Sequence, residues 1–283
     1  DVLSSRGLGD VYKRQNLMFT PRNLPFFLTK SLIEKIPKQL LAYEEVKVFG
    51  DVFYEGKSLT SNLNYSFDNG NVIQKGVVTF KDNKPIQFNG SFYINNLSLK
   101  PFDERLDGLD AKLYVSVKNI LKESIDLNYN LSVSKLFFNQ IPIFNLSFKG
   151  YYRSNTFFSD ISIKDDQISA KSAISFSFSD LPKKYQFDLN LDHLNLDLFN
   201  ENLGFGKAII SGDLTIFLVG KSFDKIQGNL LFKNLKFVNA NQSYSYNDFI
   251  IETKILNGLR SLKTINSNPV SYTHLRAHET RVH

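Results

Sequence analysis

The amino-acid sequence predicts an all-β protein built from many short, one-sided strands. Apolar and polar residues alternate with a period of two over much of the chain, which places the apolar side chains of a strand on one face. Gly, Asn and Asp interrupt this alternation at intervals of roughly 8–12 residues, as turns do in all-β proteins. The chain also contains 26 Phe and 13 Tyr residues, and aromatic side chains favour strands.

The two ends of the chain differ in composition from the interior. Residues 1–15 and 269–283 look like translated sequencing-adapter sequence, so we exclude both from fold and site reasoning. His274, His278 and His283 all lie in the second segment. We attribute their metal-like spacing to this origin and not to a metal site.

The remaining residues, 16–268, are expected to be an interior part of a longer protein. We expect a helical lead-in over residues 16–45 and a repetitive β domain over residues 46–268. Turns recur along the whole of the second segment, which favours one extended repetitive body over two globular domains.

Charge and composition exclude several classes of function. The net charge of +6 falls to +4 without the two end segments, which hold 5 of the 34 basic and 3 of the 28 acidic residues. The basic residues are spread thinly, whereas nucleic acid requires a cluster of Lys and Arg, so we expect no nucleic-acid partner.

The absence of cysteine leaves neither a disulfide framework nor a thiolate metal site. No run of about 18 apolar residues is present, so no transmembrane helix is predicted.

Residues 24–43 are the one segment with helical periodicity. Leu28, Leu32 and Ile36 recur at four-residue spacing, and Pro37 is expected to end or kink the helix. We expect one short amphipathic helix that packs on its own domain. Contact with a membrane is the alternative, although the lysines are few for binding anionic lipid.

Turn residues divide the first part of the β domain into hairpins. Asn69-Gly70 is a strong hairpin signal because both residues adopt positive φ readily, and residues 81–84 form a second predicted turn. The Gly-Lys-Ser sequences at 56–58 and 220–222 are not phosphate-binding loops, because the preceding glycine has the wrong spacing and strands follow. We interpret both as hairpin connections.

The clearest strands lie in the middle of the chain. Residues 125–134 alternate without a break, and residues 185–192 do so again. At His193 the phase slips, which predicts a β-bulge or bend before the apolar face continues to Leu198. Further turns are predicted at Gly212-Asp213 and Gly228-Asn229.

No arrangement of residues in the sequence supports catalysis. Asp103, Glu104, Asp107 and Asp110 cluster, but intervening basic residues and a glycine indicate a solvated charged loop and not a cation site. His193 has no cysteine partner and is expected to be exposed or hydrogen-bonded. Since no nucleophile and base can be paired, we predict a protein that is not an enzyme and uses no cofactor or metal.

Strands with one apolar face can be assembled in two ways. Two sheets can bury their apolar faces against each other in a sandwich, or one curved sheet can leave a long apolar trough. Periodicity does not distinguish them, because both need one-sided strands.

The order of strands and turns over residues 185–237 resembles a repeat found in bacterial envelope proteins. An alternating strand is followed by Leu-Asn-Leu, a Ser-Gly-Asp-Leu strand at 211–214, Gly-Lys-Ser-Phe-Asp at 220–224 and a Gly-Asn-Leu strand at 228–230. This order is similar to the repeat of the TamB/AsmA-like family, and residues 244–268 are similar to its next repeat.

The resemblance implies an elongated, repetitive, curved antiparallel sheet that forms a β-taco-like groove. It implies a non-enzymatic, bridge-like carrier that moves phospholipid between inner and outer membranes and supports outer-membrane assembly. Acyl chains would lie in the groove. The parent protein would be periplasmic, anchored in the inner membrane by an N-terminal segment, and joined to an outer-membrane assembly partner by a C-terminal region. We expect neither segment within these residues.

Under this hypothesis the groove floor consists of apolar residues from the central strands. Two alternatives remain open, namely a segment of an outer-membrane β-barrel and a β-rich scaffold or adhesin with a dry core that binds proteins by its sheet edges. The expected floor residues are Leu127, Tyr129, Leu131, Ile174, Phe176, Phe178, Phe187, Leu189, Leu191, Leu214, Ile216 and Leu218.

Overall fold

One antiparallel sheet of 16 strands accounts for nearly all of the residues that the structure describes. The computed structural model describes residues 11–19, 43–121, 125–178, 182–198, 208–221, 225–240, 242–256 and 259–266. The short 3-10 helix η3 (Leu196–Leu198) follows β11. The strands are β1 (Val11–Phe19), β2 (Val46–Glu55), β3 (Ser58–Phe67), β4 (Asn71–Lys81), β5 (Lys84–Leu97), β6 (Leu106–Lys118), β7 (Asp126–Phe138), β8 (Ile141–Arg153), β9 (Thr156–Lys164), β10 (Ile168–Ser177), β11 (Lys183–Asn195), β12 (Ile209–Gly220), β13 (Ile226–Val238), β14 (Ser243–Ser245), β15 (Phe249–Leu256) and β16 (Leu259–Asn266).

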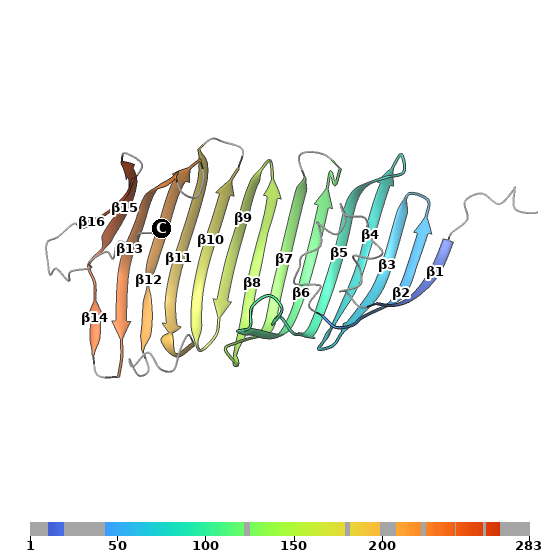
Figure 1. Cartoon of the computed structure of the whole chain (residues 1–283), viewed down its shortest axis with the longest axis horizontal. Helices are drawn as coiled ribbons and strands as arrows, with labels where there is room; N and C mark the ends of the chain where they lie inside the picture. Colours follow the sequence, from blue (N-terminus) through green and yellow to red (C-terminus); the bar gives the residue numbers. More distant parts are fainter. Residues whose placement is uncertain are drawn as a thin grey trace, which may run out of the picture.

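The strands follow one another across the sheet in chain order (Figure 1). Each pairs with its neighbours in sequence, except that β13 pairs with both β14 and β15. Because short connections join antiparallel neighbours, this meander needs only local pairing. β1 and β16 lie at opposite ends of the strand order and do not pair with each other, so the sheet is not closed. The predictions of an all-β fold and an antiparallel sheet are confirmed.

Left-handed residues form the tight turns where the sequence predicts them. The Phe67 N–H donates to the Gly70 carbonyl at 3.0 Å, which closes the turn between β3 and β4. Asp82 and Asn83, between β4 and β5, have φ values of 51° and 58°. Residues 56–58 join β2 to β3 as a hairpin, so the interpretation of that Gly-Lys-Ser sequence is also confirmed.

Two other predicted turns are wrong. Gly212-Asp213 lies inside β12, and Gly228-Asn229 lies inside β13. Gly212 and Gly228 have φ values of 150° and 149°, a backbone conformation that residues with a Cβ rarely adopt. The pairing of β12 with β13 also shifts at Gly212. These glycines therefore mark irregularities within strands and not strand ends.

The phase slip predicted at His193 is confirmed. Ser169 pairs with His193, whereas the next residue, Ala170, pairs with Leu191, so β11 accommodates an extra residue. The prediction that the strand continues to Leu198 is wrong, because β11 ends two residues after the slip and η3 follows. The tight turn of η3 buries the Leu198 side chain, which is 3% exposed.

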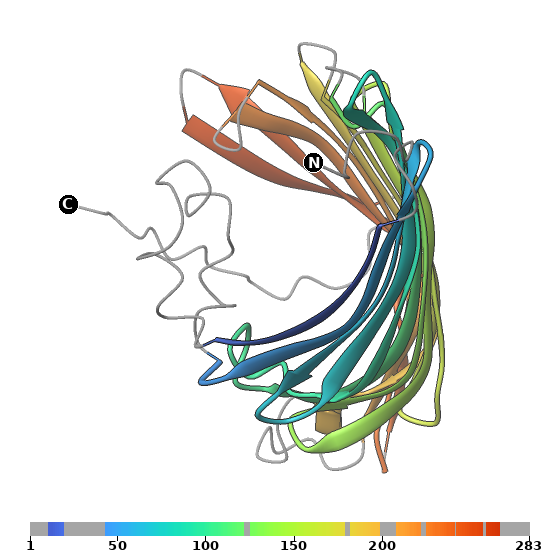
Figure 2. The same cartoon turned by 90° about the vertical axis from the view of Figure 1, so that its right-hand side faces the viewer.

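The sheet bends strongly along its strands and forms a trough with one concave and one convex side (Figure 2). Within the described ranges, no further sheet or helical layer covers either side. This part of the chain is therefore an open, single-layer sheet and not the two-layer sandwich that periodicity also permits.

Two predictions concern residues that the structure describes only in part. The predicted helix spans residues 24–43, of which all but Tyr43 lie outside the described residues, and it stays a prediction. β1 includes residues 11–15, which we assigned to adapter sequence, and pairs them with β2 from Tyr54 to Gly50. The first four residues of the expected helical lead-in, 16–19, also belong to β1.

Candidate functional site

The two faces of the sheet differ in polarity along most of its length. Residues paired across antiparallel strands point to the same face. We call the face that carries Phe187 the apolar face and the face that carries Asp188 the polar face. Three rows of paired residues cross the apolar face from β7 to β15: Leu131, Phe148, Ile161, Ser172, Leu189, Leu214, Phe232 and Phe249; Tyr129, Gly150, Ser159, Ile174, Phe187, Ile216, Leu230 and Ile251; and Leu127, Tyr152, Phe157, Phe176, Tyr185, Leu218, Gly228 and Thr253.

The apolar face lies on the concave side of the trough. Side chains inside a bend converge, whereas those outside it splay into solvent. On the polar face Tyr114, Tyr151 and Phe217 are 49%, 37% and 47% exposed, while every aromatic residue of the three rows is less exposed. Burial also raises the pKa of Tyr65, which lies on the apolar face in β3. Both observations place the apolar side chains on the inside.

The apolar face is long and uncovered. From β2 to β15 the rows cross 12 intervals between neighbouring strands, or roughly 58 Å at about 4.8 Å each. This length is about twice the ~30 Å hydrocarbon thickness of a bilayer. None of the large side chains that the structure describes is less than 2% exposed. The face is therefore crowded enough to exclude much water, yet it has no covering layer within the described part of the chain.

Eleven of the twelve expected floor residues lie in strands on the apolar face. They come from β7, β10, β11 and β12, and the register brings them into four adjacent rows. Leu191, in the fourth row, pairs with Ala170 and Gly212. Phe178 is the exception, because β10 ends at Ser177 and the Phe178 side chain is 43% exposed.

Four rings form a ladder across β7 to β11 on the apolar face. The ring centroids of Tyr129 and Phe157 lie 6.2 Å apart, those of Phe157 and Phe176 5.9 Å, and those of Phe176 and Tyr185 5.8 Å. Tyr129 reaches Phe157 by passing over β8 at Gly150, where a Cβ would lie 2.7 Å from the Tyr129 hydroxyl oxygen. The glycine therefore keeps the ladder continuous.

The apolar face is less uniform toward its N-terminal end. In the middle rows, Gly76 and Gly90 pair with each other, and Ser61 pairs with Gly76. Gln74, which is 6% exposed, donates from Nε2 to the Ser61 hydroxyl at 2.9 Å. Farther along, the buried Ser172 hydroxyl has no hydrogen-bond partner in the described part of the chain.

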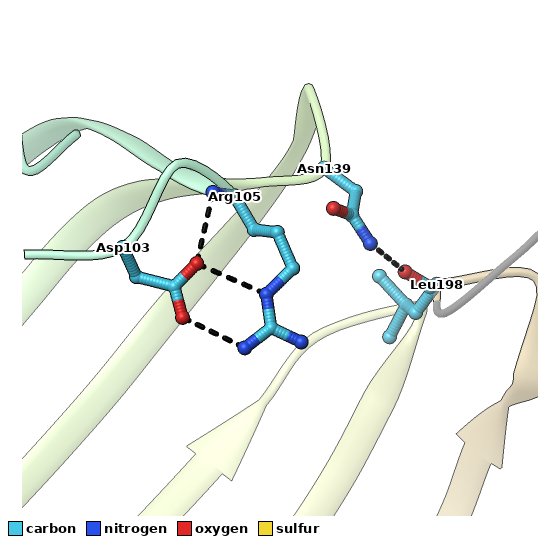
Figure 3. Close-up of polar contacts among 4 residues, drawn as sticks. All are labelled: Asp103, Arg105, Asn139 and Leu198. Atoms are coloured by element: carbon cyan, nitrogen blue, oxygen red, sulfur yellow. Dashed lines mark hydrogen bonds and ion pairs between the residues drawn. The ribbon is translucent and has the colours of Figure 1, made fainter.

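Two sets of polar contacts lie along one edge of the trough, one within a loop and one between two segments (Figure 3). Arg105 donates to the Asp103 carboxylate at 3.0 Å and 2.7 Å, and this pair lowers the pKa of Asp103 to about 2. The Asn139 side-chain amide donates to the Leu198 carbonyl at 3.0 Å. This bond joins the turn between β7 and β8 to η3, past the intervening turn between β9 and β10.

The carboxylates that cluster in sequence do not converge on a cation. Asp103 pairs with Arg105, and Asp107 forms an ion pair with Lys100 at 2.9 Å. Asp107 and Asp110 lie in β6 and not in a loop, which corrects part of the prediction. Over the described ranges, no group of three or more His, Asp or Glu side chains could hold a metal ion.

Side-chain amides of the polar face are hydrogen-bonded to a carboxylate. Asn190 and Asn234 each donate to the Asp213 carboxylate at 2.7 Å, and these bonds, that of Asn234 foremost, lower the pKa of Asp213. His193 Nε2 lies 3.1 Å from the Asp165 carbonyl oxygen. The prediction of a hydrogen-bonded histidine is therefore confirmed.

Sequence analysis missed several aromatic residues of the apolar face. Phe148 lies in a strand whose alternation is broken at Asn145, where φ is 55°. Phe157 and Phe158 are adjacent, so alternation alone does not say which of them faces inward. The two-residue turn at Ser154-Asn155 carries that information, because it pairs Tyr152 with Phe157.

In the described residues, no helix is long and apolar enough to span a membrane. When the chain is compared with protein-family models, curated proteins and solved structures, none of them matches it.

Proposed function

We propose that this chain is a non-enzymatic carrier of phospholipid that works as a bridge between two membranes. In this proposal the trough is a β-taco-like groove, and lipid acyl chains lie along its concave side. The observation that carries the proposal is the apolar face, which extends about 58 Å across the strands and which no second layer covers in the described part of the chain, with the polar side chains on the opposite face of the same strands.

The energetics favour this use of the surface. An acyl chain in water costs about 0.8 kcal/mol per exposed CH₂ group, so an apolar floor stabilises the chain wherever it lies. Neighbouring positions of the floor are chemically similar, since Phe187, Ile216 and Leu230 follow one another on successive strands. A lipid can therefore move from strand to strand without a deep energy well. Head groups would remain in water at the open side.

The setting of the protein follows from the repeat resemblance. We place the chain in the periplasm of a two-membrane envelope, where a soluble path for lipid is needed. Attachment to the inner membrane and contact with an outer-membrane assembly partner belong to the parent protein in this proposal.

Lipid transfer between vesicles tests the proposal. The purified chain would be mixed with donor vesicles that contain a fluorescent phospholipid and with unlabelled acceptor vesicles, and the rate of transfer would be followed by dequenching. We expect the chain to accelerate transfer. Ile216→Asp should reduce this effect, because a charge interrupts the apolar rows.

Thr215→Asp is the matched control, since Thr215 is the preceding residue of the same strand and lies on the polar face. It should transfer lipid as the unmodified chain does. Equal transfer by both variants, or no transfer by the unmodified chain, would contradict the proposal and favour a scaffold or adhesin role.

A further inference from the structure

A second hollow lies on the polar face, opposite the apolar trough. Its volume is about 950 Å³, and it extends from β3 to β9. A twisted sheet that is convex along its strands can be concave across them, which explains a hollow on this side. Gly76, Gly90 and Gly150 contribute backbone to its floor, while the side chains of the residues beside them form its walls.

Three of the four side-chain amides that line this hollow are free to bind a ligand, whereas that of Asn128 donates to the Asp126 carboxylate at 3.3 Å. Asn62, Asn89 and Asn130 are exposed, and their side chains make no hydrogen bond to any described residue. Farther along the polar face, by contrast, Asn190 and Asn234 both donate to Asp213. Each free amide offers two donors and an acceptor.

Two exposed tyrosines lie on the strands that flank Asn130. Tyr114 in β6 is 49% exposed and Tyr151 in β8 is 37% exposed. Tyr114 pairs with Asn130 of β7, and Asn130 pairs with Lys149 of β8. Tyr151 is two residues farther along β8, so the two tyrosines are diagonal neighbours about 12 Å apart, with Asn130 on the strand between them. Phe158 stacks on Tyr151 with ring centroids 5.4 Å apart, and Tyr114 is hydrogen-bonded to Tyr93. Both rings are therefore held in place by neighbours.

The charge of the hollow is close to neutral. Its charged side chains are Lys75, Lys149 and Asp160. Lys149 and Asp160 are opposite each other in the register of β8 and β9. This balance does not match a polyanion, and the free amides beside the aromatic rings offer hydrogen bonds that an acyl chain cannot accept or donate.

We propose that this hollow binds an uncharged, β-linked glycan chain that lies across β6, β7 and β8. The flat C–H faces of sugar rings pack on aromatic rings, and sugar hydroxyls pair with side-chain amides. Tyr114 and Tyr151 would hold two rings of the glycan, and Asn130 would bind hydroxyls between them. The site is separate from the apolar trough, so glycan and lipid could be bound together.

Titration with cellohexaose, and in parallel with chitohexaose, tests this inference by calorimetry. We expect saturable binding of at least one hexamer. Tyr114→Ala and Tyr151→Ala should each weaken binding at least tenfold. Phe217→Ala is the control, because Phe217 is an equally exposed aromatic residue of the polar face outside the hollow.

A second pair of variants tests the amides. Asn130→Ala should weaken binding several-fold, while Asn229→Ala, an exposed asparagine of the same face in β13, should not. Circular dichroism would show whether each variant keeps its strand content. The inference is overturned if neither hexamer binds at millimolar concentration, if the tyrosine variants bind unchanged, or if only a sulfated polymer such as dextran sulfate binds.

Discussion

Phe187 and Asp188 are neighbours in β11, yet they lie on opposite faces of the sheet with different neighbouring residues. Phe187 lies between Ile174 and Ile216 on the concave side, whereas Asp188 lies between Ala173 and Thr215 on the convex side. The same contrast is repeated along most strands. In the residues that the structure describes, a single bent sheet thus shields an apolar surface from water without a second layer, because the bend brings the apolar side chains together. The predictions below test this difference between the two faces.

A charge placed on the apolar face should have the largest effect. Ile174→Asp would put a carboxylate between Ser159 and Phe187 with no basic partner in its row. We expect the free energy of unfolding to fall by about 3 kcal/mol, because the charge loses hydration. Ser175→Asp, on the polar face, should change it by less than about 0.5 kcal/mol. Urea unfolding followed by circular dichroism measures both, and equal losses would mean that the two faces are equally solvated.

Removing a phenyl ring should also distinguish the faces. Phe187→Ala should lower the free energy of unfolding by about 2 kcal/mol, since it removes a half-buried ring from a packed row. Phe217→Ala should cost less than about 1 kcal/mol, because that ring is 47% exposed. The shift of the urea midpoint reports each change. If Phe217→Ala lowered the free energy of unfolding more than Phe187→Ala does, the polar face would have to be covered in solution.

A methyl group at Gly150 should destabilise the sheet and displace the Tyr129 ring on the apolar face. In Gly150→Ala the Cβ would collide with the backbone carbonyl of Phe158 and with the Tyr129 hydroxyl. We expect a loss of about 1–2 kcal/mol and a changed near-ultraviolet dichroism of tyrosine, because the Tyr129–Phe157 stack must shift. The methyl group of Gly76→Ala meets mainly the Phe88 and Gln74 side chains, which can move aside. The free energy of unfolding should therefore fall less in Gly76→Ala than in Gly150→Ala. Unchanged spectra in Gly150→Ala would contradict the account of the ladder.

Two tyrosines on opposite faces should titrate in opposite directions, with the smallest effect on stability. Burial raises the pKa of Tyr65 in the folded state above its ordinary value of 10.0. The contribution of Tyr65 to stability is therefore fully present below pH 10.0 and is lost as the pH rises through the raised pKa of the folded state. Hydrogen bonding, first to Tyr114 and then to Ser91, lowers the pKa of Tyr93 below 10.0. Its contribution is therefore present above the unfolded pKa and lost as pH falls.

Carbon NMR of labelled tyrosine, assigned with Tyr65→Phe and Tyr93→Phe, would give both values. The expected order is Tyr93 before Tyr65 as pH rises. The reverse order would mean that the apolar face is the wetter one.

The fold could be predicted from the sequence because the relevant signals are local. Period-two alternation gives the strands, and Asn69-Gly70 and residues 81–84 give turns that join neighbours, so a meander follows. Gly212 and Gly228 were misjudged because a glycine that ends a strand and one that bends it look alike in sequence. The curvature depends on bulges and twist summed over many strands, and no local pattern encodes that sum.

The candidate site was predicted only in part for a related reason. Residues in regular alternation, such as Phe187 and Leu189, were assigned to the correct face. Phe148 and Phe157 were missed, because the left-handed residue Asn145 and a double phenylalanine hide the phase there. Pairing across a turn carries the missing information, and it becomes visible only when the register is known.

Photo-crosslinking at two adjacent positions tests the central claim most directly. Benzoylphenylalanine would replace Phe187 in one sample and Asp188 in the other, and each would be irradiated with phospholipid vesicles and examined by mass spectrometry. The account predicts phospholipid adducts at position 187 and few or none at position 188. Equal adducts at both positions, or none at position 187, would contradict the claim that the concave apolar face is an open lipid-binding surface.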